Sequence, residues 1–139
     1  MRIKKCISKM IVMATILMMC YVIPVMASNY SDTTYSFYFK TEAHGASYTE
    51  AREKQDDTSV YMKCDSTTYS YTAFVVGLHD KYGIMYDVSE GHSYTFNSGT
   101  VRKMINYVYE KGYKYAAIFA ERNYSYNYSA SGVWSPDSI

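Results

Sequence analysis

Alternation between aromatic or apolar residues and polar ones is the feature that most constrains the fold of this chain. It is clearest where Tyr35, Phe37 and Phe39 occupy every second position. A period of two places such side chains together on one face of an extended strand. After residue 27 the chain holds 17 of its 18 tyrosines but one leucine and one proline. This composition favours strands over helices.

Similar alternating runs recur at near-regular spacing along the chain, separated by turn-forming residues. This spacing predicts seven or eight short strands, and no strand–helix–strand rhythm interrupts them. We therefore expect an all-β fold, an antiparallel β-sandwich or a small barrel. The candidate strands are residues 35–39, 58–64, 69–78, 84–88, 92–96, 101–109, 113–120 and 124–134.

Two connections predict hairpins between consecutive strands. The Asp-Ser-Thr-Thr turn that separates residues 58–64 from residues 69–78 has suitable turn chemistry. The segment 101–109 also fits a helical stripe, but its β-branched and aromatic residues favour a strand. A tight Glu-Lys-Gly turn then leads from that segment into residues 113–120, which predicts the second hairpin.

The segment 42–57 is polar and charged, and it interrupts the alternation. Ser47 and Glu50 have the spacing of a helix capping box, but no apolar stripe follows them. We expect a loop or a sheet edge here, with one helical turn.

The first 27 residues have the pattern of a cleaved secretory signal peptide. A basic start is followed by an uncharged, mostly apolar run at 10–26 and by a small-residue exit at Ala27. The run is short for a membrane span, and Pro24 interrupts its end. We expect cleavage to leave residues 28–139 as a single secreted β domain with no stable membrane anchor. A retained anchor is the alternative.

Cleavage would change both the charge and the cysteine content of the protein. Residues 28–139 hold ten basic and thirteen acidic residues, a formal net charge of −3, which argues against nucleic acid as a partner. Cys64 would be the single cysteine, so no internal disulfide is possible. We expect Cys64 to lie buried beside Val60 and Met62; a reactive thiol is the alternative.

Three blocks of sequence carry a resemblance to a known family: KQDDTSVYMKC at 54–64, MINYVYE at 104–110 and GVWSPDS at 132–138. In these blocks the chain resembles a family of small exported proteins of Gram-positive bacteria that share a domain of unknown function. The resemblance implies that these blocks have a structural role, and it implies no known catalytic residues.

In size and in its aromatic β pattern the chain more distantly resembles lactococcin 972-type bacteriocins. That resemblance implies a β-sandwich that acts at the envelope of sensitive bacteria.

The sequence contains none of the compact catalytic or metal-binding motifs. A nucleophile elbow, an HExxH helix, a phosphate loop and paired cysteine ligands are all absent. The acidic residues match no calcium-loop spacing. We therefore predict no enzyme activity, no cofactor and no metal. A hydrolase site assembled in space remains an alternative, which would need an acid beside one of the isolated histidines His44, His79 and His92.

The surplus of tyrosine indicates a binding function, because a tyrosine ring presents an apolar face and a polar tip. The predicted binding residues are Tyr124, Tyr126 and Tyr128 on one strand face, Tyr107 and Tyr109 across a hairpin from Tyr113 and Tyr115, and Trp134. The alternative is that these rings only stabilise the sheet through cross-strand pairing, with Trp134 in the core.

These observations together predict a secreted, non-enzymatic protein that binds a cell-wall or cell-surface component through a tyrosine-rich strand face. The alternative is a lactococcin 972-like bacteriocin that inhibits the growth of related bacteria.

Overall fold

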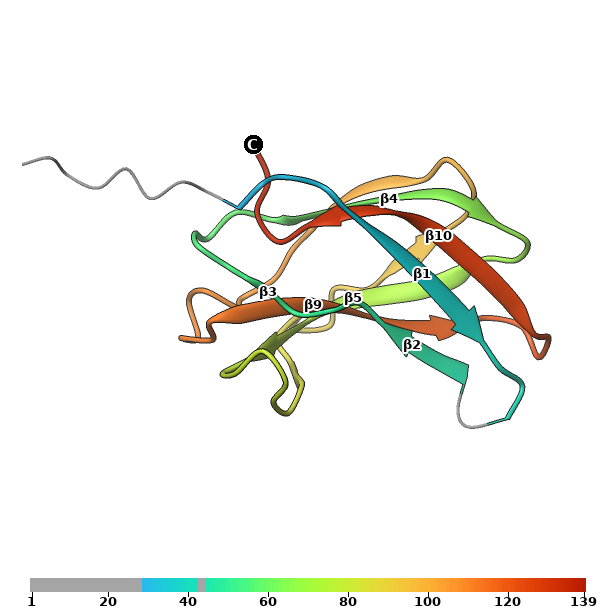
Figure 1. Ribbon diagram of the computed structural model, residues 1–139, viewed down its shortest axis with the longest axis horizontal. Coiled ribbons are helices and arrows are strands. Elements are labelled where there is room, and N and C mark those ends of the chain that lie inside the picture. The colour runs from blue at the N-terminus through green and yellow to red at the C-terminus, as the bar shows by residue number, and fades with distance from the viewer. Residues whose placement is uncertain (1–28, 43–44) are drawn as a thin grey trace, which may run out of the picture.

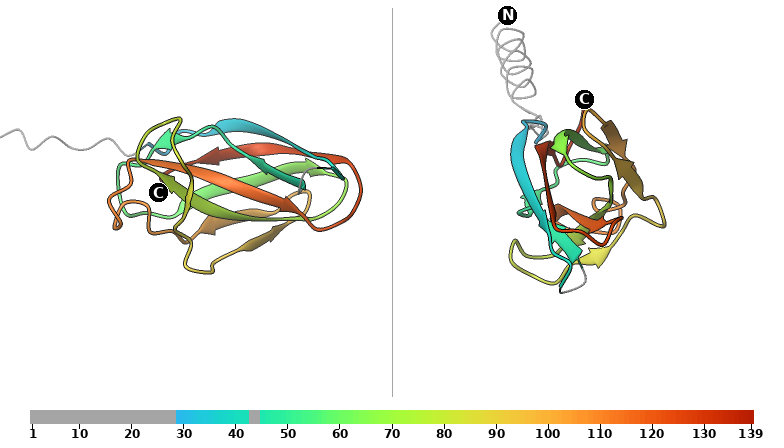
Figure 2. Two further views of the ribbon diagram at one scale, coloured as in Figure 1. Left: turned by 90° about the horizontal axis from the view of Figure 1, so that it is seen from below. Right: turned by 90° about the vertical axis from the view of Figure 1, so that its right-hand side faces the viewer.

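The computed structural model describes residues 29–42 and 45–139, which form two antiparallel β-sheets that face each other across a common interior (Figures 1 and 2). The predicted all-β antiparallel sandwich is therefore confirmed. The predicted signal peptide, residues 1–27, lies outside the described residues.

Ten strands make up the two sheets in the described part of the chain. The first sheet has the order β1 (Thr33–Phe39), β10 (Tyr128–Ser135), β4 (Val60–Thr67) and β8 (Val101–Met104). The second sheet has the order β2 (Ala46–Tyr48), β9 (Tyr115–Arg122), β5 (Tyr71–Leu78) and β6 (Tyr86–Asp87). In that sheet β3 (Arg52–Glu53) also pairs with β9, and β7 (Tyr94–Phe96) pairs with β5.

The segment 42–57 accounts for two strands that the alternation does not predict. Strands β2 and β3 lie in it and both pair with β9, so the expected sheet edge is confirmed. The expected helical turn is wrong, because Ser47 is an extended residue of β2 opposite Ala120. Pairing with a long neighbouring strand outweighs the local capping signal.

Both predicted hairpins are wrong, because consecutive long strands lie in different sheets. Strand β4 belongs to the first sheet and β5 to the second, and the same is true of β8 and β9. The segment 101–109 is a strand over its first four residues, and Val108 begins a turn. Alternation fixes which side chains of a strand face the core but not which sheet the strand joins, and residues of β4, β5, β8 and β9 all contribute to one core between the sheets.

The core lies between the sheets and is rich in aromatic rings. Phe37, Phe39, Tyr71, Phe96 and Trp134 are almost completely buried. Tyr71 stacks on Phe96 at 5.4 Å between ring centroids and meets Phe37 edge-on at 5.8 Å. Burying one such side chain contributes about 1.5–3 kcal/mol, so the alternating aromatic residues stabilise the fold.

Cys64 lies in this core, as the sequence predicts. Its side chain is buried together with those of Val60 and Met62 on the inner face of β4. A thiol in this position acts as a small apolar group.

One hydrogen-bonded tyrosine pair lies inside the otherwise apolar core. The hydroxyl oxygens of Tyr35 and Tyr71 are 2.8 Å apart, and the Tyr35 hydroxyl also donates to the Lys63 carbonyl oxygen at 3.3 Å. Burial raises the pKa of both phenols well above their usual value. The pair links the two sheets, because Tyr35 belongs to β1 and Tyr71 to β5.

The chain terminates at one end of the sandwich (Figure 1). At this end lies a group of buried and half-buried polar residues, which we call the polar clasp: Asn29, Lys54, Gln55, Thr58 and Asp137. Lys54 Nζ and Asp137 Oδ1 are 2.7 Å apart, and both side chains are completely buried. The Lys54 ammonium also donates to the Thr58 carbonyl oxygen at 2.6 Å. The other Asp137 oxygen, Oδ2, accepts from the backbone N–H groups of Asn29 at 2.8 Å and Gln55 at 3.2 Å.

The three sequence blocks 54–64, 104–110 and 132–138 meet at the polar clasp. The Asn106 side-chain amide donates to the Thr58 carbonyl oxygen at 3.3 Å. The Ser138 backbone N–H donates to the Thr58 hydroxyl oxygen at 3.0 Å. Residues far apart in the sequence thus share one hydrogen-bonded network.

The tyrosine pair predicts a loss of stability in alkali. The unfolded chain releases both phenolic protons near pH 10, whereas the folded chain retains them. Stability is therefore retained below about pH 10 and falls above it, by about 1.4 kcal/mol per pH unit for each group. Urea unfolding at a series of alkaline pH values measures this slope.

The double variant Tyr35→Phe/Tyr71→Phe should flatten that alkaline slope while costing about 1–2 kcal/mol at neutral pH for the two lost hydrogen bonds. The control Tyr82→Phe instead removes a hydroxyl from a side chain that is almost fully exposed. An alkaline slope that is the same in the double variant and the wild type would contradict this account.

The register of β10 against β4 shifts between Ser131 and Gly132. A Cβ at Gly132 would collide with the Lys63 carbonyl oxygen and would lie 2.9 Å from the Tyr35 hydroxyl oxygen. Gly132→Ala should therefore destabilise the fold by about 1–3 kcal/mol, measured by urea unfolding. The exposed neighbour Ser131 gives the control Ser131→Ala, expected within about 0.5 kcal/mol of wild type.

Candidate functional site

The end of the sandwich opposite the polar clasp carries a cluster of exposed tyrosines on two connections between the sheets. Residues 68–70 join β4 to β5, and residues 123–127 join β9 to β10. The Tyr69 ring lies 5.3 Å from that of Tyr124 and 5.4 Å from that of Tyr126, centroid to centroid. We call Tyr69, Tyr124 and Tyr126 the tyrosine platform; their exposed fractions are 37%, 48% and 59%.

The expected strand ladder of Tyr124, Tyr126 and Tyr128 does not form. Strand β9 ends at Arg122 and β10 begins at Tyr128, so Tyr124 and Tyr126 lie in the loop between them. Tyr128 turns inward and packs on Phe39 at 4.8 Å. Alternation continues through this loop in the sequence, which is why the loop resembles a strand.

Sequence reasoning missed Tyr69, the ring that both loop tyrosines contact. Alternation predicts Tyr69 at the start of the strand 69–78, but Tyr69 lies in a bend before β5. The Thr67 hydroxyl donates to the Tyr69 carbonyl oxygen at 2.7 Å and holds this bend. The Asp-Ser-Thr-Thr turn chemistry next to it was the available signal.

Buried Tyr128 gives the tyrosine platform a rigid base. Its hydroxyl donates to the Ser70 carbonyl oxygen at 2.8 Å and accepts from the Asn123 backbone N–H at 3.2 Å. These two bonds join the loop of Tyr69 to the loop of Tyr124 and Tyr126. Burial raises the pKa of the Tyr128 phenol, an effect that the Asn123 hydrogen bond opposes.

The asparagines of the longer loop add further contacts. Asn123 accepts from the Thr72 hydroxyl at 2.9 Å through its side-chain oxygen and donates to the Ser70 hydroxyl at 3.2 Å. Asn127 accepts from the Thr41 backbone N–H at 2.7 Å. The platform rings are thus exposed while the backbone beneath them is anchored, an arrangement that limits the entropy lost on binding.

The second predicted group of tyrosines does not assemble as expected. Because β8 ends at Met104, Tyr107 and Tyr109 lie in the connection to β9 rather than on a strand opposite Tyr113 and Tyr115. Tyr113 instead stacks on His79 with ring centroids 4.5 Å apart.

The structure places Trp134, another predicted binding residue, in the core. Its side chain is buried, and the Arg52 guanidinium lies over its ring at 5.7 Å. This burial corresponds to the core alternative for Trp134.

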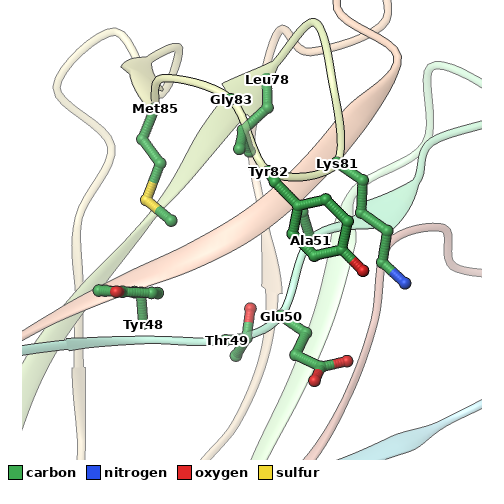
Figure 3. A pocket seen from close by; sticks show the side chains of 9 residues that line it. All are labelled: Tyr48, Thr49, Glu50, Ala51, Leu78, Lys81, Tyr82, Gly83 and Met85. Carbon is green, nitrogen blue, oxygen red and sulfur yellow. The ribbon is translucent and has the colours of Figure 1, made fainter.

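A pocket of about 280 Å³ opens on the outer face of the second sheet, between β2–β3 and the loop after β5 (Figure 3). Ala51 and Leu78 line it and belong to a small apolar cluster on this face. Glu50 and Lys81 add opposite charges, and Tyr82 stands almost fully exposed beside them. The pocket suits a small apolar group flanked by polar atoms.

The described residues contain no group of three or more His, Cys, Asp or Glu side chains that could hold a metal ion. His79 and His92 are both exposed, and His44 lies outside the described residues. Within residues 29–42 and 45–139, no helix is long and apolar enough to cross a membrane.

Removing the Tyr128 hydroxyl tests the base of the tyrosine platform. Tyr128→Phe should cost about 1–2 kcal/mol, because both hydrogen bonds are lost. Amide hydrogen exchange should become faster at Asn123, which loses its acceptor. The control Tyr126→Phe removes an exposed hydroxyl from the same loop. Unchanged protection of the Asn123 amide in Tyr128→Phe would contradict the anchoring role.

Comparison of the chain with models of known protein families finds a match to one family. A family model described as "Protein of unknown function (DUF2712)" matches residues 23–138. No curated protein matches the chain. The family match agrees with the predicted resemblance to a family that shares a domain of unknown function. The match does not connect the chain with lactococcin 972-type bacteriocins. The chain therefore belongs to the DUF2712 family.

Proposed function

We propose that this protein is a secreted, non-enzymatic module that binds a polymer of the cell envelope through the tyrosine platform. The observation that carries the proposal is the stacking of three exposed rings on two anchored loops. Because the rings of Tyr69, Tyr124 and Tyr126 remain largely exposed, burial of their apolar faces is still available to a ligand.

The ligand class follows from the chemistry of these rings. A tyrosine offers a flat apolar face with a hydroxyl at its rim, which suits sugar rings and extended peptides alike. Sugar rings and extended peptides both occur in the polymers of a bacterial cell wall. The resemblance to exported proteins of Gram-positive bacteria suggests the cell wall as the binding target. Tyrosine is also enriched among the residues that dominate binding energies at interfaces.

The charge of the protein supports stacking over electrostatic attraction. Residues 28–139 carry a formal net charge of −3, and Tyr69, Tyr124 and Tyr126 are uncharged side chains. Binding governed by ring stacking should change little between low and high salt, whereas attraction between surface charges is screened.

The test measures binding of the purified protein to isolated cell-wall material. The triple variant Tyr69→Ser/Tyr124→Ser/Tyr126→Ser should bind at least about tenfold more weakly, because hot-spot rings contribute about 2 kcal/mol or more each. It should still fold, because Tyr128 and its hydrogen bonds remain. The matched control is Tyr38→Ser, which removes a 52% exposed tyrosine from β1.

Equal binding by the triple variant and the wild type would disprove the role of the tyrosine platform. A wild type that does not bind wall material would remove the envelope as the target. Growth of related bacteria, followed during the same incubations, distinguishes simple binding from inhibition. Growth arrest by the wild type and not by the triple variant would favour the bacteriocin-like alternative.

A further inference from the structure

The Lys54–Asp137 pair in the polar clasp brings an amine and a carboxyl group together, both buried from solvent. Nζ and Oδ1 are 2.7 Å apart, and neither side chain is exposed. Burying two opposite charges carries a large desolvation cost that their attraction repays only in good geometry. A reaction that converts the pair into one uncharged group would remove that cost.

A second carboxylate lies next to the same amine. Asp56 Oδ1 is 3.6 Å from Lys54 Nζ, and the Asp56 side chain is partly exposed. The Thr58 backbone N–H donates to this oxygen at 2.9 Å, and the Thr58 hydroxyl donates to it as well. These bonds fix the Asp56 carboxylate beside the pair, within reach of both the buried amine and solvent.

Two backbone N–H groups point at the oxygen of Asp137 that does not contact Lys54. Asn29 donates to Oδ2 at 2.8 Å. The Gln55 N–H is shared, at 3.2 Å from Oδ2 and 3.4 Å from Oδ1. Preorganised donors of this kind stabilise negative charge that develops on an oxygen during attack at a carbonyl carbon. The site therefore combines a nucleophile, an electrophile, a proton carrier and an oxyanion pocket.

We propose that Lys54 and Asp137 condense into an intramolecular isopeptide bond, with Asp56 carrying the protons. Proton transfer through Asp56 converts the ammonium and the carboxylate into an amine and a carboxylic acid. The Nζ lone pair attacks Asp137 Cγ, and the negative charge forms on Oδ2 between the two N–H donors. Asp56 takes a proton from the nitrogen and delivers one to Oδ1, which leaves as water.

The step balances without an oxidant or a cofactor. One N–C bond forms, one C–O bond breaks, and one water molecule is released, while Asp56 returns to its starting state. Fixed proximity replaces the entropy cost of bringing the groups together. The complete burial of the Lys54 and Asp137 side chains disfavours hydrolysis of the product.

The bond would join the segment before β4 to the segment after β10, 83 residues apart in the sequence. A covalent link across such a long loop restricts the unfolded chain, as a disulfide does. Cys64 is buried and forms no disulfide in the structure. The proposed bond would supply a cross-link by different chemistry.

The test is a tryptic digest of the denatured full-length chain, analysed by mass spectrometry. Trypsin does not cleave after an acylated lysine, so peptide 53–63 should appear joined to peptide 123–139. The combined mass should equal the sum of the two peptides less one water. Separate peptides in the wild type, with cleavage after Lys54, would overturn the proposal. Loss of water within one peptide alone would also overturn it.

Three variants define the chemistry. Lys54→Arg should abolish the joined peptide. Asp56→Asn should leave the two peptides separate, and a joined peptide in that variant would disprove the proton-carrying role. Asp137→Asn is the matched control, because an amide leaves ammonia instead of water and yields the same joined peptide. The wild-type digest decides the main question even where a variant fails to fold.

Discussion

The buried Lys54–Asp137 contact is the interaction on which the rest of the sandwich depends. It joins the stretch that enters β4 to the stretch that leaves β10, and Asp137 also holds the first described residues through Asn29. Removing one member of a buried pair leaves an uncompensated charge, at a cost of about 3–5 kcal/mol. That cost is a large fraction of the stability of an ordinary domain.

The two ends of the molecule differ in their chemistry. The clasp end is polar and closed, and its hydrogen bonds are directed inward. The opposite end anchors its loops through Tyr128 and Asn123 but leaves the rings of Tyr124 and Tyr126 in solvent. Recognition usually resides in loops held by a rigid scaffold, and these loops fit that pattern.

Sequence patterning predicted the strand faces and missed the contacts between strands. Alternation with a period of two residues places Val60, Met62 and Cys64 on one face of a strand. It does not indicate which sheet that strand joins, so both predicted hairpins are wrong. The Lys54–Asp137 contact spans 83 residues, and no local pattern reveals it. Tyr124 and Tyr126 were predicted as binding residues, but alternation placed them on a strand. Their contact with Tyr69 depends on two crossings between the sheets.

The strand order also determines when the fold can form. β10 lies between β1 and β4, and β9 pairs with β2, β3 and β5, so one internal strand of each sheet comes from the last quarter of the chain. In a chain made from its N-terminus, β1, β2 and β3 would therefore lack a strand partner until β9 and β10 had been made. Contacts this distant in sequence slow folding, and unpaired edges can join other chains. The first three strands therefore join their sheets only through residues 115–135, which supply a partner to both layers.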